Sequence, residues 1–115
     1  MGFLNSILGK EDVVVDGRQH VGTLCKSFKA SFGTELRVYK SLNTGRGAKR
    51  AGPKQTLASI CDNKIEGITI KKKHTVGEIE DQFKEKMGIG IQIMQPDGES
   101  FAPNNMRLQD VSTMK

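Results

Sequence analysis

The fold is decided by residues 68–95, which read ITIKKKHTVGEIEDQFKEKMGIGIQIMQ. Ile68 and Ile70 alternate with polar neighbours, which is the period-two pattern of a half-buried strand. Apolar residues then recur at helical spacing from Val76 to Met87, and this predicts a helix with one buried stripe. The alternation returns at residues 91–93. The stretch therefore predicts a strand–helix–strand unit.

Both ends of this helix carry sequence signals of their own. Thr75 and Glu78 stand three residues apart, as in a capping box, where each side chain bonds the other residue's backbone N–H. Gly88 follows the last apolar position, where a left-handed residue commonly ends a helix. The segment Pro96-Asp97-Gly98-Glu99 then predicts a turn after the second strand.

The same pattern occurs earlier in the chain. Residues 13–40 fall on residues 68–95 after a shift of 55 positions without a gap, and Gly33 then meets Gly88. Five of the 28 aligned residues are identical, and the apolar positions agree across strand, helix and strand. After a loop four residues longer in the first copy, residues 57–60 match residues 108–111. We infer an internal duplication with copies at about 13–60 and 68–111.

Two such units predict one α+β domain over residues 13–115, preceded by an amphipathic arm at 1–12 with apolar Phe3, Leu4, Ile7 and Leu8. Tandem β-α-β repeats can share one sheet with both helices on one face, in a ferredoxin-like or β-grasp-like arrangement. The arm is expected to dock on the domain's own core or on a partner.

The second unit also resembles part of a ubiquitin-like β-grasp domain. The resemblance covers residues 66–111 and rests on Thr75-Val76-Gly77-Glu78-Ile79, Gly88-Ile89, Asp97-Gly98-Glu99-Ser100-Phe101 and Leu108-Gln109-Asp110-Val111. The chain ends at Lys115 with neither the closing strand nor the diglycine tail of that family. The resemblance therefore implies a docking module and not conjugation to other proteins.

Charge is unevenly distributed along the chain. Residues 1–55 hold ten Lys and Arg against four Asp and Glu, whereas residues 56–115 hold eight against nine. Between Glu35 and Asp62 there is no acidic residue. A basic region of this kind attracts polyanions or acidic partners.

The Gly-rich loop 41–54 lies in this basic region and contains the extra residues of the first copy. Cationic side chains on such a loop can pair with phosphates, although a solvated hairpin tip is the simpler interpretation. The candidate nucleic-acid-binding residues are Arg37, Lys40, Arg46, Lys49, Arg50 and Lys54. Tyr39 is the one aromatic residue on the expected strands, so base stacking on the sheet has little support.

No arrangement of residues marks a catalytic, cofactor or metal site. His20, His74, Cys25 and Cys61 lack metal-ligand spacing, and no base is placed beside either thiol. The carboxylates of residues 76–87 alternate with lysines, which indicates a solvated helix face. Two unpaired cysteines are typical of a reducing cytoplasm, and no apolar run approaches the length of a membrane span.

These observations favour a non-catalytic binding module that docks a macromolecular partner, most simply a protein. The alternative is low-specificity nucleic-acid binding through loop 41–54. An exposed strand edge would also allow two copies to pair as a homodimer.

Overall fold

The computed structural model describes residues 12–42, 44, 47–61 and 66–114, so all but the last residue of the predicted N-terminal arm lies outside the described residues. The order of elements is β1 (Val13–Val15), α2 (Val21–Phe32), β2 (Leu36–Val38), α3 (Leu57–Ile60), β3 (Ile68–Ile70), α4 (Val76–Met87), β4 (Ile91–Ile93) and α5 (Leu108–Val111). The predicted α+β class and the two strand–helix–strand units are confirmed.

The two units carry the same elements at matching positions. Both long helices end at a glycine in the left-handed region, Gly33 with φ 71° and Gly88 with φ 65°, where a residue with a Cβ would be strained. Each helix buries four residues at helical spacing: Val21, Leu24, Phe28 and Phe32 on α2, and Val76, Ile79, Phe83 and Met87 on α4. The apolar pattern of the sequence therefore identifies the buried stripe of each helix.

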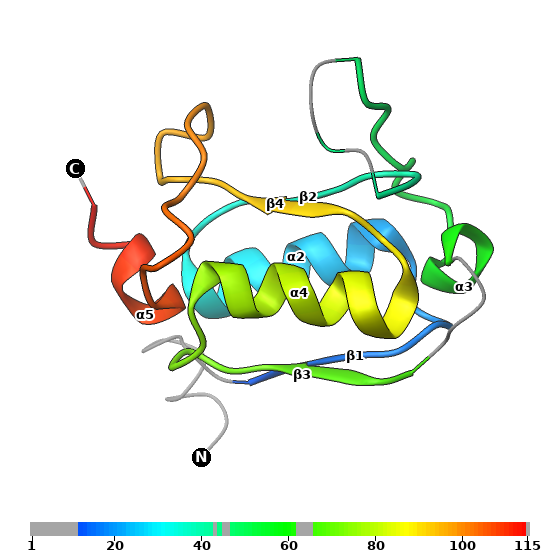
Figure 1. The fold of residues 1–115 in the computed structure, drawn as a ribbon, viewed down its shortest axis with the longest axis horizontal. Coiled ribbons are helices and arrows are strands. Elements are labelled where there is room, and N and C mark those ends of the chain that lie inside the picture. Colours follow the sequence, from blue (N-terminus) through cyan, green and yellow to red (C-terminus); the bar gives the residue numbers. More distant parts are fainter. Residues whose placement is uncertain (1–11, 43, 45–46, 62–65, 115) are drawn as a thin grey trace.

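The strands form two separate antiparallel pairs, β1 with β3 and β2 with β4. Figure 1 shows α2 and α4 running between the β1–β3 pair on one side and the β2–β4 pair on the other. This corrects one part of the sequence prediction, which placed all four strands in a single sheet with both helices on one face.

The pairing has a simple geometric reason. The centre of each pair joins equivalent positions of the two units, Val14 with Thr69 and Arg37 with Gln92. Equivalent residues of two units can pair with each other in this way only next to a two-fold axis, so the units are related by an approximate two-fold rotation. Each strand finds its partner in the other unit, while a layer of helix, about 10–12 Å thick with its side chains, lies between the two strands of its own unit (Figure 1).

A hairpin follows each strand of the β2–β4 pair and contacts the opposite unit. In each hairpin, the segment that returns forms an antiparallel bridge with the residue after the strand: Arg50 with Tyr39 in the first unit and Phe101 with Met94 in the second. The Arg37 guanidinium donates to the Gly98 carbonyl at 2.9 Å, and the Gln92 side-chain amide donates to the Thr44 hydroxyl at 3.0 Å. Both hairpins are therefore held by the strand of the other unit.

One hydrophobic core joins the two units. Its side chains come from all four strands and from the buried stripes of both long helices. The largest include Phe28 and Phe32, whose ring centroids lie 5.1 Å apart in an edge-on arrangement. Among the described residues, no helix is both long enough and apolar enough to span a bilayer.

Candidate functional site

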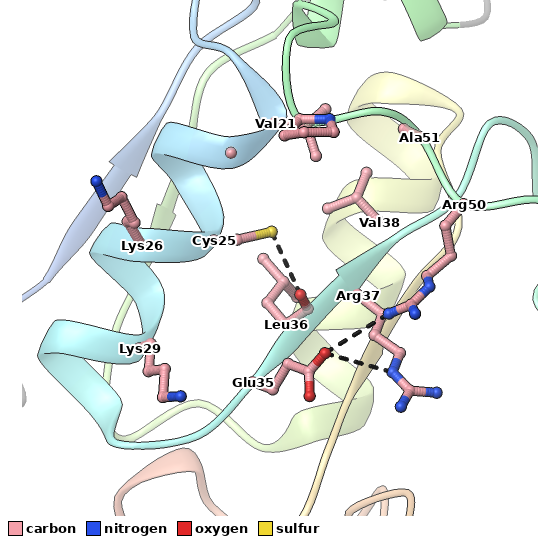
Figure 2. Close-up of a pocket in the computed structure, with 12 residues that line it drawn as sticks. Val21, Cys25, Lys26, Lys29, Glu35, Leu36, Arg37, Val38, Arg50 and Ala51 are labelled. Atoms are coloured by element: carbon pink, nitrogen blue, oxygen red, sulfur yellow. Dashed lines mark hydrogen bonds and ion pairs between the residues drawn. The ribbon is translucent and has the colours of Figure 1, made fainter. Parts of the chain in front are cut away.

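A groove lies between α2 and the edge of β2. It has a volume of about 410 Å³, within the range of small-ligand and short-peptide sites. We call it the α2–β2 groove. Its lining includes Cys25, Lys26 and Lys29 from α2, Glu35 to Val38 around β2, and Arg50, Ala51 and Pro53 from the returning hairpin segment. Figure 2 shows the helix forming one wall and the strand the other.

The thiol of Cys25 points across this groove to the strand. Its Sγ donates to the Leu36 carbonyl at 3.3 Å, a contact drawn in Figure 2. Burial raises the pKa of Cys25, the charge of Glu35 raises it further, and Arg50 partly offsets the rise. Cys25 is therefore a neutral thiol at physiological pH, whereas nucleophilic cysteines are thiolates.

The rim of the groove is basic. Lys26 and Lys29 are exposed on α2, and the guanidinium groups of Arg37 and Arg50 lie on the strand side (Figure 2). Glu35 is the single carboxylate in the lining. One of its oxygens lies 3.6 Å from Arg37 Nε and 3.5 Å from Arg50 Nη1, so two cations share one anion. The rim keeps an excess of positive charge.

The predicted nucleic-acid-binding residues divide into two groups. Arg37 and Arg50 meet at Glu35, and the Arg37 side chain is only 24% exposed. Lys40 and Lys49 lie opposite each other on the hairpin, where the Lys40 N–H donates to the Lys49 carbonyl at 3.0 Å. Lys40, Lys49 and Lys54 are all exposed, and Arg46 lies outside the described residues. Two of the described cations are therefore paired with a carboxylate, and the side chains of the other three are exposed.

A second, smaller groove occupies the related position beside α4 and has a volume of about 220 Å³. Its lining includes Glu80, Asp81 and Lys84 from α4, and Leu42 and Thr44 from the hairpin of the first unit. Glu80 and Asp81 stand where α2 has Cys25 and Lys26, so the two grooves differ in charge.

Glu80 differs from the other carboxylates of α4. Burial raises its pKa to about 7, and the neighbouring charge of Asp81 contributes to the rise. The helical spacing of the apolar residues on α4 leaves Glu80 outside the buried stripe and predicts it on the solvated face. Leu42 and Thr44 of the other unit's hairpin line the same groove as Glu80, and no local pattern predicts this.

The thiols and imidazoles of the chain remain apart. Within the described ranges, no three His, Cys, Asp or Glu side chains gather closely enough to hold a metal ion. His74 accepts the Lys71 N–H at its Nδ1, 3.2 Å away. Burial raises the pKa of Cys61.

The comparisons with known proteins give no family to which the chain could be assigned. No family model, no curated protein and no solved structure matches the sequence or the fold. The geometry of the α2–β2 groove is therefore the basis for a functional proposal.

Proposed function

We propose that this protein is a non-catalytic docking module that binds a partner protein in the α2–β2 groove. The observation that carries the proposal is the groove itself, where apolar side chains and a strand edge form the floor and basic side chains form the rim. Apolar grooves with a few convergent polar groups are typical binding sites. The charged rim would guide an acidic partner into place.

The chemistry of the groove supports binding over catalysis. The one thiol in the lining has a raised pKa, and the one carboxylate is shared by two arginines. Neither group is an activated nucleophile or a free general base. The protein therefore offers a shaped surface and no reactive group at this position.

Nucleic-acid binding is the second candidate function, and the exposed side chains of Lys40, Lys49 and Lys54 favour it. Two further predicted contacts, Arg37 and Arg50, are engaged with Glu35, which reduces their capacity to pair with phosphates. A fluorescence-anisotropy titration with short DNA and RNA at two salt concentrations tests this candidate. Salt-sensitive binding that disappears when Arg46, Lys49 and Arg50 are neutralised would place nucleic-acid binding first.

Site-specific photocrosslinking in the native cells tests the docking proposal. A benzoylphenylalanine replaces Lys26 in the α2–β2 groove, and the control carries it at Asp81, the equivalent position of α4. We expect crosslinked adducts at position 26 that are sensitive to protease and resistant to nuclease. They should weaken when Glu replaces Lys29 and remain when Glu replaces Lys72, which lies in the turn before α4.

Three outcomes would contradict the docking proposal. Equal yields of crosslinked adducts at positions 26 and 81 would show that the partner does not prefer the α2–β2 groove. Adducts sensitive to nuclease would instead support nucleic-acid binding. The absence of adducts at position 26 would show that no partner protein binds in the groove.

Three further proposals accompany this function. The two-fold relation and the shared element order support the internal duplication inferred from the sequence. Cys25 and Cys61 are both free thiols, which is compatible with the reducing cytoplasm that we propose as its location. An exposed strand edge also allows two copies to pair as a homodimer.

A further inference from the structure

The hairpin that follows β2, called the first hairpin, contributes to both grooves. Its outgoing arm lines the smaller groove beside α4 with Leu42 and Thr44. Its returning arm lines the α2–β2 groove with Arg50, Ala51 and Pro53. Figure 2 shows Arg50 and Ala51 across this groove from α2. A displacement of the hairpin therefore changes the shape of both grooves.

Backbone hydrogen bonds connect the two arms of the first hairpin. The Lys40 N–H donates to the Lys49 carbonyl at 3.0 Å, where the arms lie side by side. The Ala51 N–H donates to the Val38 carbonyl at 2.9 Å and joins the returning arm to the end of β2. Because these bonds are continuous along the hairpin, a movement of the outgoing arm also displaces the returning arm.

The outgoing arm is held against the second unit beside Glu80. The Ser41 carbonyl accepts the Gly90 N–H at 3.0 Å, and the Thr44 hydroxyl accepts the side-chain amide of Gln92 at 3.0 Å. Glu80 is half-buried and lines the same small groove as this arm. The position of the arm and the charge on Glu80 therefore affect each other within one confined space.

The surroundings of Glu80 favour its neutral form. Of the described residues that line the groove, its charged neighbours are Asp81 and Lys84, both on α4, while the lining residues from the hairpin and from β4 carry no charge. Burial raises the pKa of Glu80 to about 7, and the charge of Asp81 adds to the rise. Ionisation places a second negative charge beside Asp81, and displacement of the outgoing arm would let water reach that charge.

We propose that the proton on Glu80 stabilises the first hairpin against β4 and, through the paired arms, the hairpin side of the α2–β2 groove. The neutral carboxyl favours the ordered hairpin, so this stabilisation is complete in acid and is lost as the pH rises through neutrality. Partner binding then weakens, because Arg50, Ala51 and Pro53 no longer hold their places in the groove. This inference rests on the proposed docking function and adds its regulation by pH.

Hydrogen exchange of the free, full-length protein labelled with ¹⁵N tests the coupling. After correction for the intrinsic pH dependence of exchange, protection of the Lys40, Ala51 and Gly90 amides should fall about five- to twentyfold between pH 5.5 and pH 8. The upper value assumes that displacement of the arm restores the ordinary pKa of Glu80, and the lower value allows for the partial exposure of its side chain. Protection that is independent of pH would overturn the proposal.

The hairpin of the second unit supplies an internal control. Its equivalent amides are those of Gln95, which donates to the Ser100 carbonyl at 2.7 Å, and Ala102, which donates to the Ile93 carbonyl at 2.8 Å. Their protection should change less than about twofold over the same pH range, because Glu80 lies in the groove of the first hairpin. An equal fall at both hairpins would report a loss of stability of the whole protein and would overturn the proposal.

Two matched variants assign the effect to Glu80. Glu80→Gln keeps the shape of the side chain without its titration, so the protection of the first hairpin should stay at its low-pH value up to pH 8. Glu85→Gln on the exposed face of α4 should retain the pH dependence of the unmodified protein. A pH dependence that persists in Glu80→Gln would belong to another group and would overturn the proposal.

Crosslinking from position 26 connects the hairpin with docking. In extracts of the native cells, adducts of the benzoylphenylalanine protein should be at least about twofold more abundant at pH 6 than at pH 8, and Glu80→Gln should abolish this difference.

The regulation and the docking function can fail separately. Adducts whose yield is the same at both pH values would overturn the regulation by Glu80 and leave the docking function standing. Hairpin exchange that follows the ionisation of Glu80, without any protein adduct at position 26, would contradict the docking function instead.

Discussion

Glu80 is a half-buried carboxylate on α4. Burial and the nearby charge of Asp81 raise its pKa to about 7, whereas an unfolded chain would hold it near the ordinary value for Glu. Lys84 lines the same groove and carries the opposite charge. Between these two pKa values the folded protein binds more protons than the unfolded chain, so stability falls as pH rises through this window.

We therefore predict that Glu80→Gln raises the free energy of unfolding more at pH 8 than at pH 4.5. Above pH 7 the wild-type side chain is charged in a half-buried position, and the amide removes that cost. Below pH 4.5 the carboxyl is neutral in both states, so the difference becomes small. Urea denaturation at several pH values measures this. Glu85→Gln on the exposed face of α4 is the control, and a gain independent of pH would contradict the burial of Glu80's charge.

The two long helices begin differently, although they occupy equivalent places. Thr75 Oγ1 accepts the Glu78 N–H at 3.2 Å, and Glu78 Oε1 accepts the Thr75 N–H at 2.8 Å. This confirms the capping box predicted from the sequence. His20 caps α2 with extended backbone angles, and its side chain makes no capping hydrogen bond.

Thr75→Ala should therefore lower the free energy of unfolding by about 1 kcal/mol, because the Glu78 N–H loses its acceptor, the Thr75 hydroxyl. His20→Ser should raise it by a few tenths of a kcal/mol or more, because its backbone angles already suit a capping hydroxyl. Thermal and urea denaturation of both variants provide the measurement. An equal loss from His20→Ala and Thr75→Ala would show that the side-chain cap of α4 contributes nothing.

At the scale of elements, the contact between the first hairpin and β4 depends on Gly90. A Cβ at this position would lie 2.6 Å from Thr44 Cγ2, 2.8 Å from the Ser41 carbonyl oxygen and 2.9 Å from that of Leu42. Two of these atoms are backbone, and the Ser41 carbonyl also accepts the Gly90 N–H at 3.0 Å. Relief of the overlap would require the hairpin to move.

Gly90→Ala should accordingly lower the free energy of unfolding by about 1–3 kcal/mol, the usual cost of overpacking. It should also bring the pKa of Glu80 closer to its ordinary value, because the displaced hairpin no longer covers that side chain. NMR titration of the Glu80 carboxyl and urea denaturation measure both effects. Gly67→Ala is the control, since its nearest neighbour would be the Val15 carbonyl oxygen at 3.6 Å. If the pKa of Glu80 stays near 7 in Gly90→Ala, the hairpin is not the cause of the burial of Glu80.

The elements themselves could be predicted from the sequence, whereas their pairing could not. Period-two and helical spacing are local, so they locate β3, α4 and β4 together with their counterparts in the first unit. The choice between one sheet and two depends on contacts between residues far apart in the chain, such as Val14 with Thr69. Spacing carries no information about these contacts.

The candidate site also combines features that the sequence predicts with features that depend on contacts between distant residues. The basic residues of the first unit were visible in the sequence, but their engagement with Glu35 was not. The α2–β2 groove depends on the returning arm of the first hairpin, which the pairing of Tyr39 with Arg50 places beside β2.

At the scale of the whole molecule, neither unit contains a complete sheet. Every strand pairs with its counterpart in the other unit, and both buried helix stripes enter one core. A single unit would expose two unpaired strands and one apolar helix stripe. The stability of the protein is therefore a property of the two units together.

We predict that separate fragments 1–63 and 64–115 are unfolded as monomers and fold when they are mixed. The mixture should give a one-to-one complex with the circular dichroism and NMR spectrum of the intact chain, and its stability should depend on concentration. Because equivalent residues meet at the centre of each strand pair, one fragment at high concentration can also form a two-fold homodimer. Light scattering and circular dichroism across a dilution series distinguish these states. A fragment that remains folded as a monomer at high dilution would show that one unit can satisfy its own strands, contrary to the pairing in the intact protein.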